Sequence, residues 1–365
     1  MSGYIFAFFF LFFIAGMIIS SFKGPFPVAS SADEHYTNKN YSQAAAEYEY
    51  LLDKYPTSKY ADTALKKLPY SHYLASDYSK TIFYLEKAIE KGLINQNELE
   101  IKTIFADCYV QLARNLDKNG NIREAISNYL KSIEYLREIG NNFPDSNEAF
   151  IAKYKIPEYL LNTASLYRRG LLWDDAVSIL NRVINDYPDS DYQLKAHAML
   201  FGTYVNIAVS CKEKGDYDES IKNFLKVYKL PAEILDSRKY EIDALFEYFV
   251  ADAPADDILK AANGLFFQER YLESMMLYDY ILKNFPEHAQ EITEHAVKAK
   301  INLLSHLNYK IISASEPVGS FAKSGTAKIT FDNKTDYGLT LYIGGPQYNI
   351  LRLEKNQRVE LELLQ

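Results

Sequence analysis

Cysteine is almost absent from this sequence: only Cys108 and Cys211 occur in 365 residues. Neither belongs to a CxxC pair, a zinc-ligand spacing or a haem-attachment motif, so the sequence offers no cysteine-based metal or haem site. Each cysteine lies within an apolar helical pattern. Two buried, unreactive thiols are therefore favoured over a Cys108–Cys211 disulfide formed in an oxidising compartment.

Basic residues are also in deficit, with 40 Lys and Arg against 48 Asp and Glu, a formal net charge of −8 and a pI near 5.4. This balance repels a phosphate backbone, so we predict no nucleic-acid partner.

No catalytic arrangement of residues is recognisable. The strongest metal candidate is His288, Glu291 and His295, whose offsets of three and seven share one helical face. They lack the pair of histidines four apart, with a glutamate between, that a zinc protease requires. A solvated helix face is favoured, and we predict no catalytic residue, no metal and no cofactor.

Charge is missing altogether from residues 4–22, a 19-residue apolar run. As a helix rising ~1.5 Å per residue it would span about 28 Å, close to the hydrocarbon thickness of a bilayer. We predict an uncleaved membrane anchor in preference to a signal peptide cut near residues 29–32. No cysteine follows the run at a lipoprotein-type position.

What the sequence has is a repeat. Six large or apolar reference residues are each followed three positions later by a small residue and seven positions later by a bulky one. Five of the six are preceded, nine positions earlier, by alanine; Pro69 is the exception. The reference residues are Tyr41, Tyr78, Ile122, Trp173, Tyr217 and Tyr271.

Offsets of three and seven keep to one face of a helix, and the alanine nine positions earlier lies on a preceding helix. A small residue on both helices permits a close crossing, so each copy predicts a helical hairpin. Pro56, Pro188 and Pro286 should end second helices, and a nearby Ser or Asp should cap the next helix. Pro69 and Pro157 should kink or end first helices, and a break is expected at residues 251–257.

This pattern resembles the tetratricopeptide repeat (TPR). The YPxS motif between its hairpins is similar to that of exported bacterial envelope TPR proteins. The resemblance implies a TPR-like helical-hairpin solenoid. Together with the apolar N-terminal run and the C-terminal alternation described below, it predicts a mainly α fold with an N-terminal transmembrane or signal segment and a small C-terminal antiparallel β module. It also favours an extracytoplasmic body, although Lys23 after the apolar run would favour a cytoplasmic one. We expect a signal anchor or signal peptide at 1–29 and about six hairpins at 30–312.

A linker is predicted at residues 313–324 because small and turn-forming residues gather there. Alternating apolar residues at 325–365 then predict a four-stranded antiparallel unit. Its last strand has no closing turn. It lies inside the sheet, or pairs with something else, or belongs to a module that is incomplete in this sequence.

We therefore predict a non-enzymatic, membrane-tethered scaffold in the cell envelope that binds a protein or peptide partner. Membrane attachment would use residues 4–22. First-helix tyrosines are the candidate partner contacts, although packing between helices would explain them equally well: Tyr109, Tyr167 and Tyr204. The same features would also suit self-association, or a structural or glycan-associated role in which the β module binds and the solenoid is a spacer.

Overall fold

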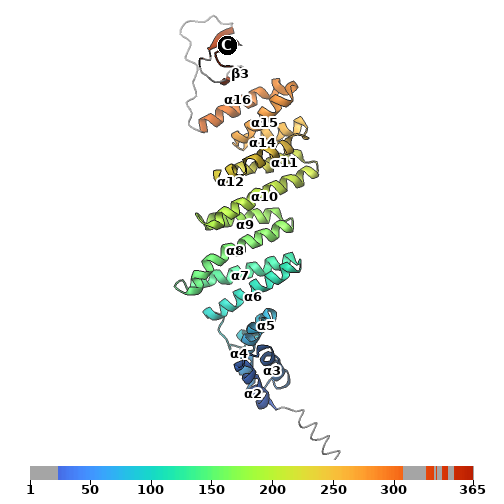
Figure 1. Ribbon diagram of the computed structural model, residues 1–365, viewed down its shortest axis with the longest axis vertical. Helices are drawn as coiled ribbons and strands as arrows, with labels where there is room; N and C mark the ends of the chain where they lie inside the picture. The colour runs from blue at the N-terminus through green and yellow to red at the C-terminus, as the bar shows by residue number, and fades with distance from the viewer. Residues whose placement is uncertain (1–23, 307–325, 333, 335–338, 344–348, 365) are drawn as a thin grey trace, which may run out of the picture. The chain divides into compact units, whose positions relative to one another are not determined.

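The computed structural model describes residues 24–306, 326–332, 334, 339–343 and 349–364 (Figure 1). The chain divides into two compact units, residues 1–196 and 197–365, and each is described by itself. The predicted anchor at 4–22 and the predicted linker at 313–324 lie outside the described residues. No helix among the residues that the structure describes is long and apolar enough to cross a bilayer.

The first unit consists of antiparallel helix pairs in which each helix packs on the next along the chain (Figure 1). Its helices are α2 (Pro25–Thr37), α3 (Tyr41–Lys54), α4 (Ala61–Leu74), α5 (Tyr78–Glu90), α6 (Leu99–Lys118), α7 (Ile122–Asn142), α8 (Asn147–Arg169) and α9 (Trp173–Asp186). Helix α10 (Asp191–Glu213) begins in this unit and ends in the second.

The second unit is mainly helical too. Its helices are α11 (Tyr217–Phe224), η1 (Leu225–Lys229), α12 (Ala232–Ser237), α13 (Lys239–Val250), α14 (Ala255–Phe267), α15 (Tyr271–Asn284), η2 (Pro286–His288) and α16 (Ala289–His306). The predicted break at 251–257 is confirmed, because α13 ends and α14 begins there. The extra helices α12 and α13 separate the last two hairpins, which explains the long spacing between Tyr217 and Tyr271.

The repeat positions carry the packing that the sequence predicts. Each of the six reference residues is the first residue of the second helix in a pair. The small residues three positions later and the bulky residues seven positions later are all buried. In two pairs the small residue reaches across the crossing: the Ser220 hydroxyl donates to the Ala208 carbonyl at 2.7 Å, and Ser274 donates to Ala262 at 3.0 Å. The TPR-like hairpin fold is confirmed.

Proline has two different roles in these helices. Pro56, Pro188 and Pro286 each follow the end of a second helix, as predicted. Of the two alternatives expected at Pro69 and Pro157, a kink or an end, the end is wrong, because α4 and α8 continue through these prolines. Both prolines are buried, so packing around them holds the helix despite the missing backbone donor.

The predicted serine caps form at two of the helix starts. Ser146 accepts a hydrogen bond from the Ala149 N–H at 3.0 Å, and Ser190 accepts one from the Gln193 N–H at 3.2 Å. The hydroxyl oxygen of Ser58 makes no such bond within the described residues. A capping hydroxyl satisfies one of the free N–H groups in the first helical turn. The proline-containing segments that carry Ser146 and Ser190 therefore stabilise the next helix directly.

One turn conformation closes all six described hairpins. Two residues before each second helix, the backbone is left-handed, with φ between 58° and 79°, at Lys39, Ser76, Gly120, Leu171, Gly215 and Glu269. The next residue donates its N–H to the carbonyl five residues earlier, at 2.8–3.0 Å. This is the Schellman arrangement, which ends a helix by satisfying its last carbonyls. Only two of the six left-handed positions are glycine, although this conformation favours it.

Two opposite substitutions test these turns. Leu171→Gly should raise the free energy of unfolding by about 0.5–1 kcal/mol, because it relieves a left-handed leucine. That leucine is 69% exposed, so little packing is lost. Gly120→Ala should lower the free energy by about 1 kcal/mol. An added Cβ there meets nothing within 4 Å, so the cost is conformational. Chemical denaturation of both variants measures the pair; changes of the same sign would contradict the account.

The described strands form two small sheets. β1 (Thr326–Asp332) pairs antiparallel with β4 (Arg358–Leu364), and β2 (Leu339–Ile343) pairs antiparallel with β3 (Asn349–Leu353). The four strands of the predicted antiparallel unit are present, and they are arranged as two two-stranded sheets. Alternation identifies the face of each residue but not the partner of each strand. The last strand pairs with the first, and β2 and β3 contact α16, where Leu353 is buried.

Candidate partner-binding groove

Three adjoining cavities lie along the first helices of the first four hairpins, all within the first unit. Their volumes are about 400, 560 and 310 Å³. Tyr36 and Tyr70 line both the first cavity and the middle one. Tyr73, Thr103 and Glu148 line both the middle cavity and the last. Because they share these walls, the three cavities form a row that follows the first helices.

We call this row of cavities the tyrosine groove, and define it by Tyr36 of α2, Tyr70 and Tyr73 of α4, Thr103 of α6, and Glu148 and Tyr159 of α8. The repeat places these residues together, since equivalent faces of successive first helices lie side by side. Ser132, Leu136 and Ile139 of α7 add to the lining of the last cavity and are buried.

Tyr73 is held at the junction of two cavities. Its hydroxyl donates to Asp107 Oδ2 at 2.9 Å, and Gln111 donates to the other oxygen of that carboxylate at 3.2 Å. Burial raises the pKa of Tyr73 above its ordinary value, and the hydrogen bond to Asp107 and its negative charge raise it further. The phenol therefore stays protonated and fixed in place.

Tyr159 forms the far wall of the groove. Burial raises the pKa of this tyrosine to about 12. The Arg114 guanidinium lies 5.9 Å from the ring centroid and the Lys155 ammonium 6.0 Å from it, both within range of a cation–π contact. Lys155 also pairs with Glu158 at 3.1 Å.

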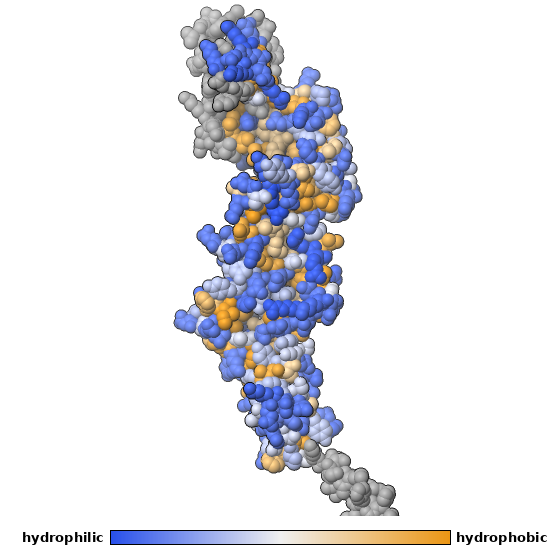
Figure 2. All heavy atoms as spheres, in the orientation of Figure 1, coloured by the Kyte–Doolittle hydropathy of each residue, from blue (hydrophilic) through white to orange (hydrophobic). Residues whose placement is uncertain are grey.

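Exposed apolar side chains border the groove. Leu74 is 45% exposed and lines the middle cavity, and Ile151 is 44% exposed and lines the last. Phe150 and Tyr154 are exposed on the same turn of α8, with their rings 5.1 Å apart. Hydrophilic residues cover much of the face shown in Figure 2, with hydrophobic patches between them. A polar surface with local apolar anchors is typical of a protein-binding surface.

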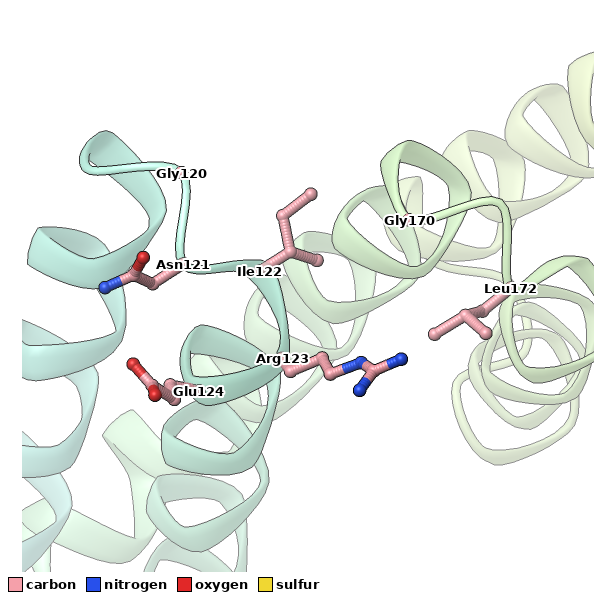
Figure 3. A pocket seen from close by; sticks show the side chains of 7 residues that line it. All are labelled: Gly120, Asn121, Ile122, Arg123, Glu124, Gly170 and Leu172. Atoms are coloured by element: carbon pink, nitrogen blue, oxygen red, sulfur yellow. The ribbon is translucent and has the colours of Figure 1, made fainter.

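A fourth cavity, of about 400 Å³, lies at the turns of the third and fourth hairpins. Figure 3 shows Gly120, Asn121 and Glu124 from one turn region and Gly170 and Leu172 from the other, with the Arg123 side chain extending towards Leu172. None of its residues lines the tyrosine groove.

The three tyrosines proposed from the sequence do not line the tyrosine groove. Tyr109 is buried, and its ring stacks on Phe105 and Tyr135 at centroid distances of 6.3 and 5.8 Å. Tyr167 is half-buried at the end of α8. Tyr204 belongs to the second unit, where it is half-buried and the Lys226 ammonium lies 5.8 Å from its ring. A partner-binding role for these three stays a prediction.

The groove residues were missed because a first-helix face is recognisable in sequence only when it repeats. Tyr36, Tyr70 and Tyr159 occupy different repeat offsets. The available signal was the shared offset of Tyr36 and Tyr73, each of which lies five residues before a reference residue, Tyr41 and Tyr78. The two cysteines are free thiols: Cys108 is buried, and burial raises its pKa to about 12, whereas Cys211 is only half-buried.

A protein-family model described as "YfiO: Outer membrane lipoprotein" matches residues 28–219, more than half of the chain. The chain belongs to the YfiO family. The matched region contains the whole tyrosine groove. This membership confirms the prediction of an exported or membrane-anchored envelope TPR protein with an extracytoplasmic body.

Among relatives of this YfiO-family chain, the "Outer membrane protein assembly factor BamD" of Pasteurella multocida (strain Pm70) is 23% identical over 191 residues. These cover 47% of this chain and 70% of that protein. Among solved structures, the apo form of RapI is 16% identical, with a TM-score of 0.27, over 77% of this chain and 99% of that one. A TPR protein from Parabacteroides merdae is 13% identical, with a TM-score of 0.24, over 76% and 98%.

Proposed function

We propose that this YfiO-family protein is a scaffold in the assembly of outer membrane proteins, and that it holds an extended segment of another polypeptide in the tyrosine groove. The observation that carries the proposal is the row of three adjoining cavities across four hairpins. An extended chain suits a long groove because each successive side chain meets a new helix. Fixed phenols and exposed Leu74 and Ile151 supply hydrogen bonds and apolar contact.

The role in assembly rests on the family and on the relative named for that process. The proposal assigns the groove a role in binding and includes no catalytic step. The Tyr73 phenol donates to the Asp107 carboxylate, which Gln111 also engages, so this pair serves to fix the ring in place.

The first helix supports membrane attachment through uncleaved residues 4–22. The cleavage region considered at residues 29–32 lies inside α2, where Val28 and Ala32 are buried against α3 and α4. A cut there would divide a helix that belongs to the core.

Site-specific photo-crosslinking in intact cells tests the groove. A benzoyl-phenylalanine in place of Ile151, within the groove, should give crosslinks to an outer membrane protein or an assembly component, identified by mass spectrometry. The matched control replaces Phe83, which is 56% exposed on the second helix of the second hairpin and lies outside the groove. It should give at least about tenfold less of that product, a difference of ~1.4 kcal/mol in association.

Equal crosslinking from both positions would contradict a groove-specific partner. Crosslinks only between copies of this chain would favour self-association. Loss of the partner on deletion of residues 313–365, with Ile151 intact, would favour the role in which the β module binds.

A further inference from the structure

The middle cavity of the tyrosine groove has an unusual charge. Its walls carry three tyrosines, Tyr36, Tyr70 and Tyr73, and two carboxylates, Glu100 and Glu148. No lysine, arginine or histidine lines this cavity of about 560 Å³. Its lining therefore combines aromatic rings with uncompensated negative charge.

The two carboxylates have no ion pair and no side-chain hydrogen bond within the described residues 24–306. Lysines occur only in the linings of the adjoining cavities, and two of them have other partners. Lys67 pairs with Asp33 at 2.8 Å, and Lys155 pairs with Glu158 at 3.1 Å. The third, Lys66, is exposed to solvent and lines the first cavity alone. The negative charge of the middle cavity thus has no lysine of its own to neutralise it.

This negative charge affects the pKa values of the tyrosines. Burial raises the pKa of Tyr70 above its ordinary value, and Glu100 is the next largest cause, followed by Glu98. Burial also raises the pKa of Tyr36; Tyr41 adds to the increase, the Lys67 charge opposes it, and Glu100 makes a smaller contribution to it. Both rings are half-buried, so each keeps a surface that faces the cavity.

Glu100 and Glu148 each lie in the first turn of a helix, α6 and α8, where the helix dipole favours a negative charge. The helix dipole therefore stabilises the two charged carboxylates, but it places no cationic side chain beside them. Aromatic faces beside carboxylates attract a cation both through the ring quadrupole and through direct charge pairing.

From this charge complementarity we infer that the middle cavity is a subsite for a basic side chain, Lys or Arg, of the extended segment that the groove binds. The inference rests on the proposed function, and it adds a requirement on the partner: a cationic residue flanked by residues that suit the apolar Leu74 and Ile151 positions. The ring walls contact the alkyl stem, and Glu100 and Glu148 pair with the charged head.

Selection from a displayed library of random peptides tests the subsite, with the full-length chain in detergent micelles as bait. Peptides recovered by the native chain should be enriched in Lys and Arg. Glu100→Gln with Glu148→Gln should abolish the enrichment, and Glu100→Lys with Glu148→Lys should replace it with Asp and Glu. The matched control is Glu124→Gln, which removes the same charge from the first turn of α7, in the separate cavity of Figure 3.

Fluorescence anisotropy then measures one selected peptide. Exchange of its basic residue for norleucine should weaken binding to the native chain about tenfold. The same exchange should change binding to the double glutamine variant less than about twofold, and added salt should weaken only the native pairing.

Three results are decisive. The pattern above supports the subsite. Peptides that depend on Ile151 but show no basic enrichment, or whose enrichment survives in the double glutamine variant, overturn the subsite and leave the proposed groove intact. Failure to recover any peptide whose binding depends on Ile151 overturns both. Cooperative thermal unfolding of each variant excludes misfolding as the cause.

Discussion

Replacement of Phe224 by alanine is expected to lower the free energy of unfolding of the second unit by about 4 kcal/mol. Phe224 is the bulky repeat residue of the fifth hairpin and is fully buried. Its ring packs against Phe249 of α13 at a centroid distance of 4.9 Å. The variant loses the transfer free energy of a whole aromatic ring and leaves a cavity that helices on both sides must close. Urea denaturation followed by circular dichroism measures the loss.

Phe267 provides the matched control, because it is the same residue type in the same unit and is 80% exposed. Phe267→Ala should change the free energy of unfolding by less than about 0.5 kcal/mol. If the two variants lost similar stability, the repeat position would not be a core position and the hairpin packing described above would be wrong.

The second large effect concerns a buried charge. Lys102 of α6 is 3% exposed, and its ammonium pairs with Glu138 of α7. Glu138→Ala should cost about 2–3 kcal/mol, because it leaves a buried ammonium without its carboxylate. Lys102→Met should cost less than about 1 kcal/mol, since an apolar side chain of similar length fills the same space. Calorimetric unfolding of both variants gives the comparison.

The double variant completes this test. In the Lys102→Met background, Glu138→Ala should cost less than about 0.5 kcal/mol, because Glu138 is already partly exposed and no longer has a cation to neutralise. A larger cost for Lys102→Met than for Glu138→Ala would show that the pair stabilises the fold by attraction, not merely by mutual compensation.

The sequence predicted the helical hairpins, and the structure shows that each reference residue, from Tyr41 to Tyr271, begins a second helix. This success has a physical cause: a close helix crossing demands small side chains at fixed offsets, and those offsets are local in the sequence. The end of α9 before Pro188 could be predicted for the same reason, since a missing N–H acts on its own helix.

The sequence did not show what distant residues decide. Pro157 remains inside α8 because neighbouring helices bury it, and the sequence around it does not show those neighbours. The pairing of β1 with β4 joins residues that are far apart in the sequence, so local alternation does not predict it. Leu171 and Glu269 adopt a left-handed backbone although neither is glycine. The shared turn therefore could not be predicted from residue type alone.

The candidate site could be predicted only in outline. First-helix tyrosines line the groove, but they are Tyr36, Tyr70 and Tyr73. Tyr109, named from the sequence, packs on Phe105 and Tyr135 instead. Which face of a first helix is open depends on the two helices that flank it. The unpaired charge of Glu100 and Glu148 likewise emerges only once α6 and α8 lie beside α4.

The shared Schellman turn has a consequence for biogenesis. Each hairpin is closed by a hydrogen bond that spans five residues, and each helix of the first unit packs mainly on its neighbours in the chain. Contacts of such short range form quickly and in any order along a solenoid. A polypeptide delivered across a membrane from its N-terminus can therefore fold hairpin by hairpin as it arrives, and the tyrosine groove is complete once α8 has emerged.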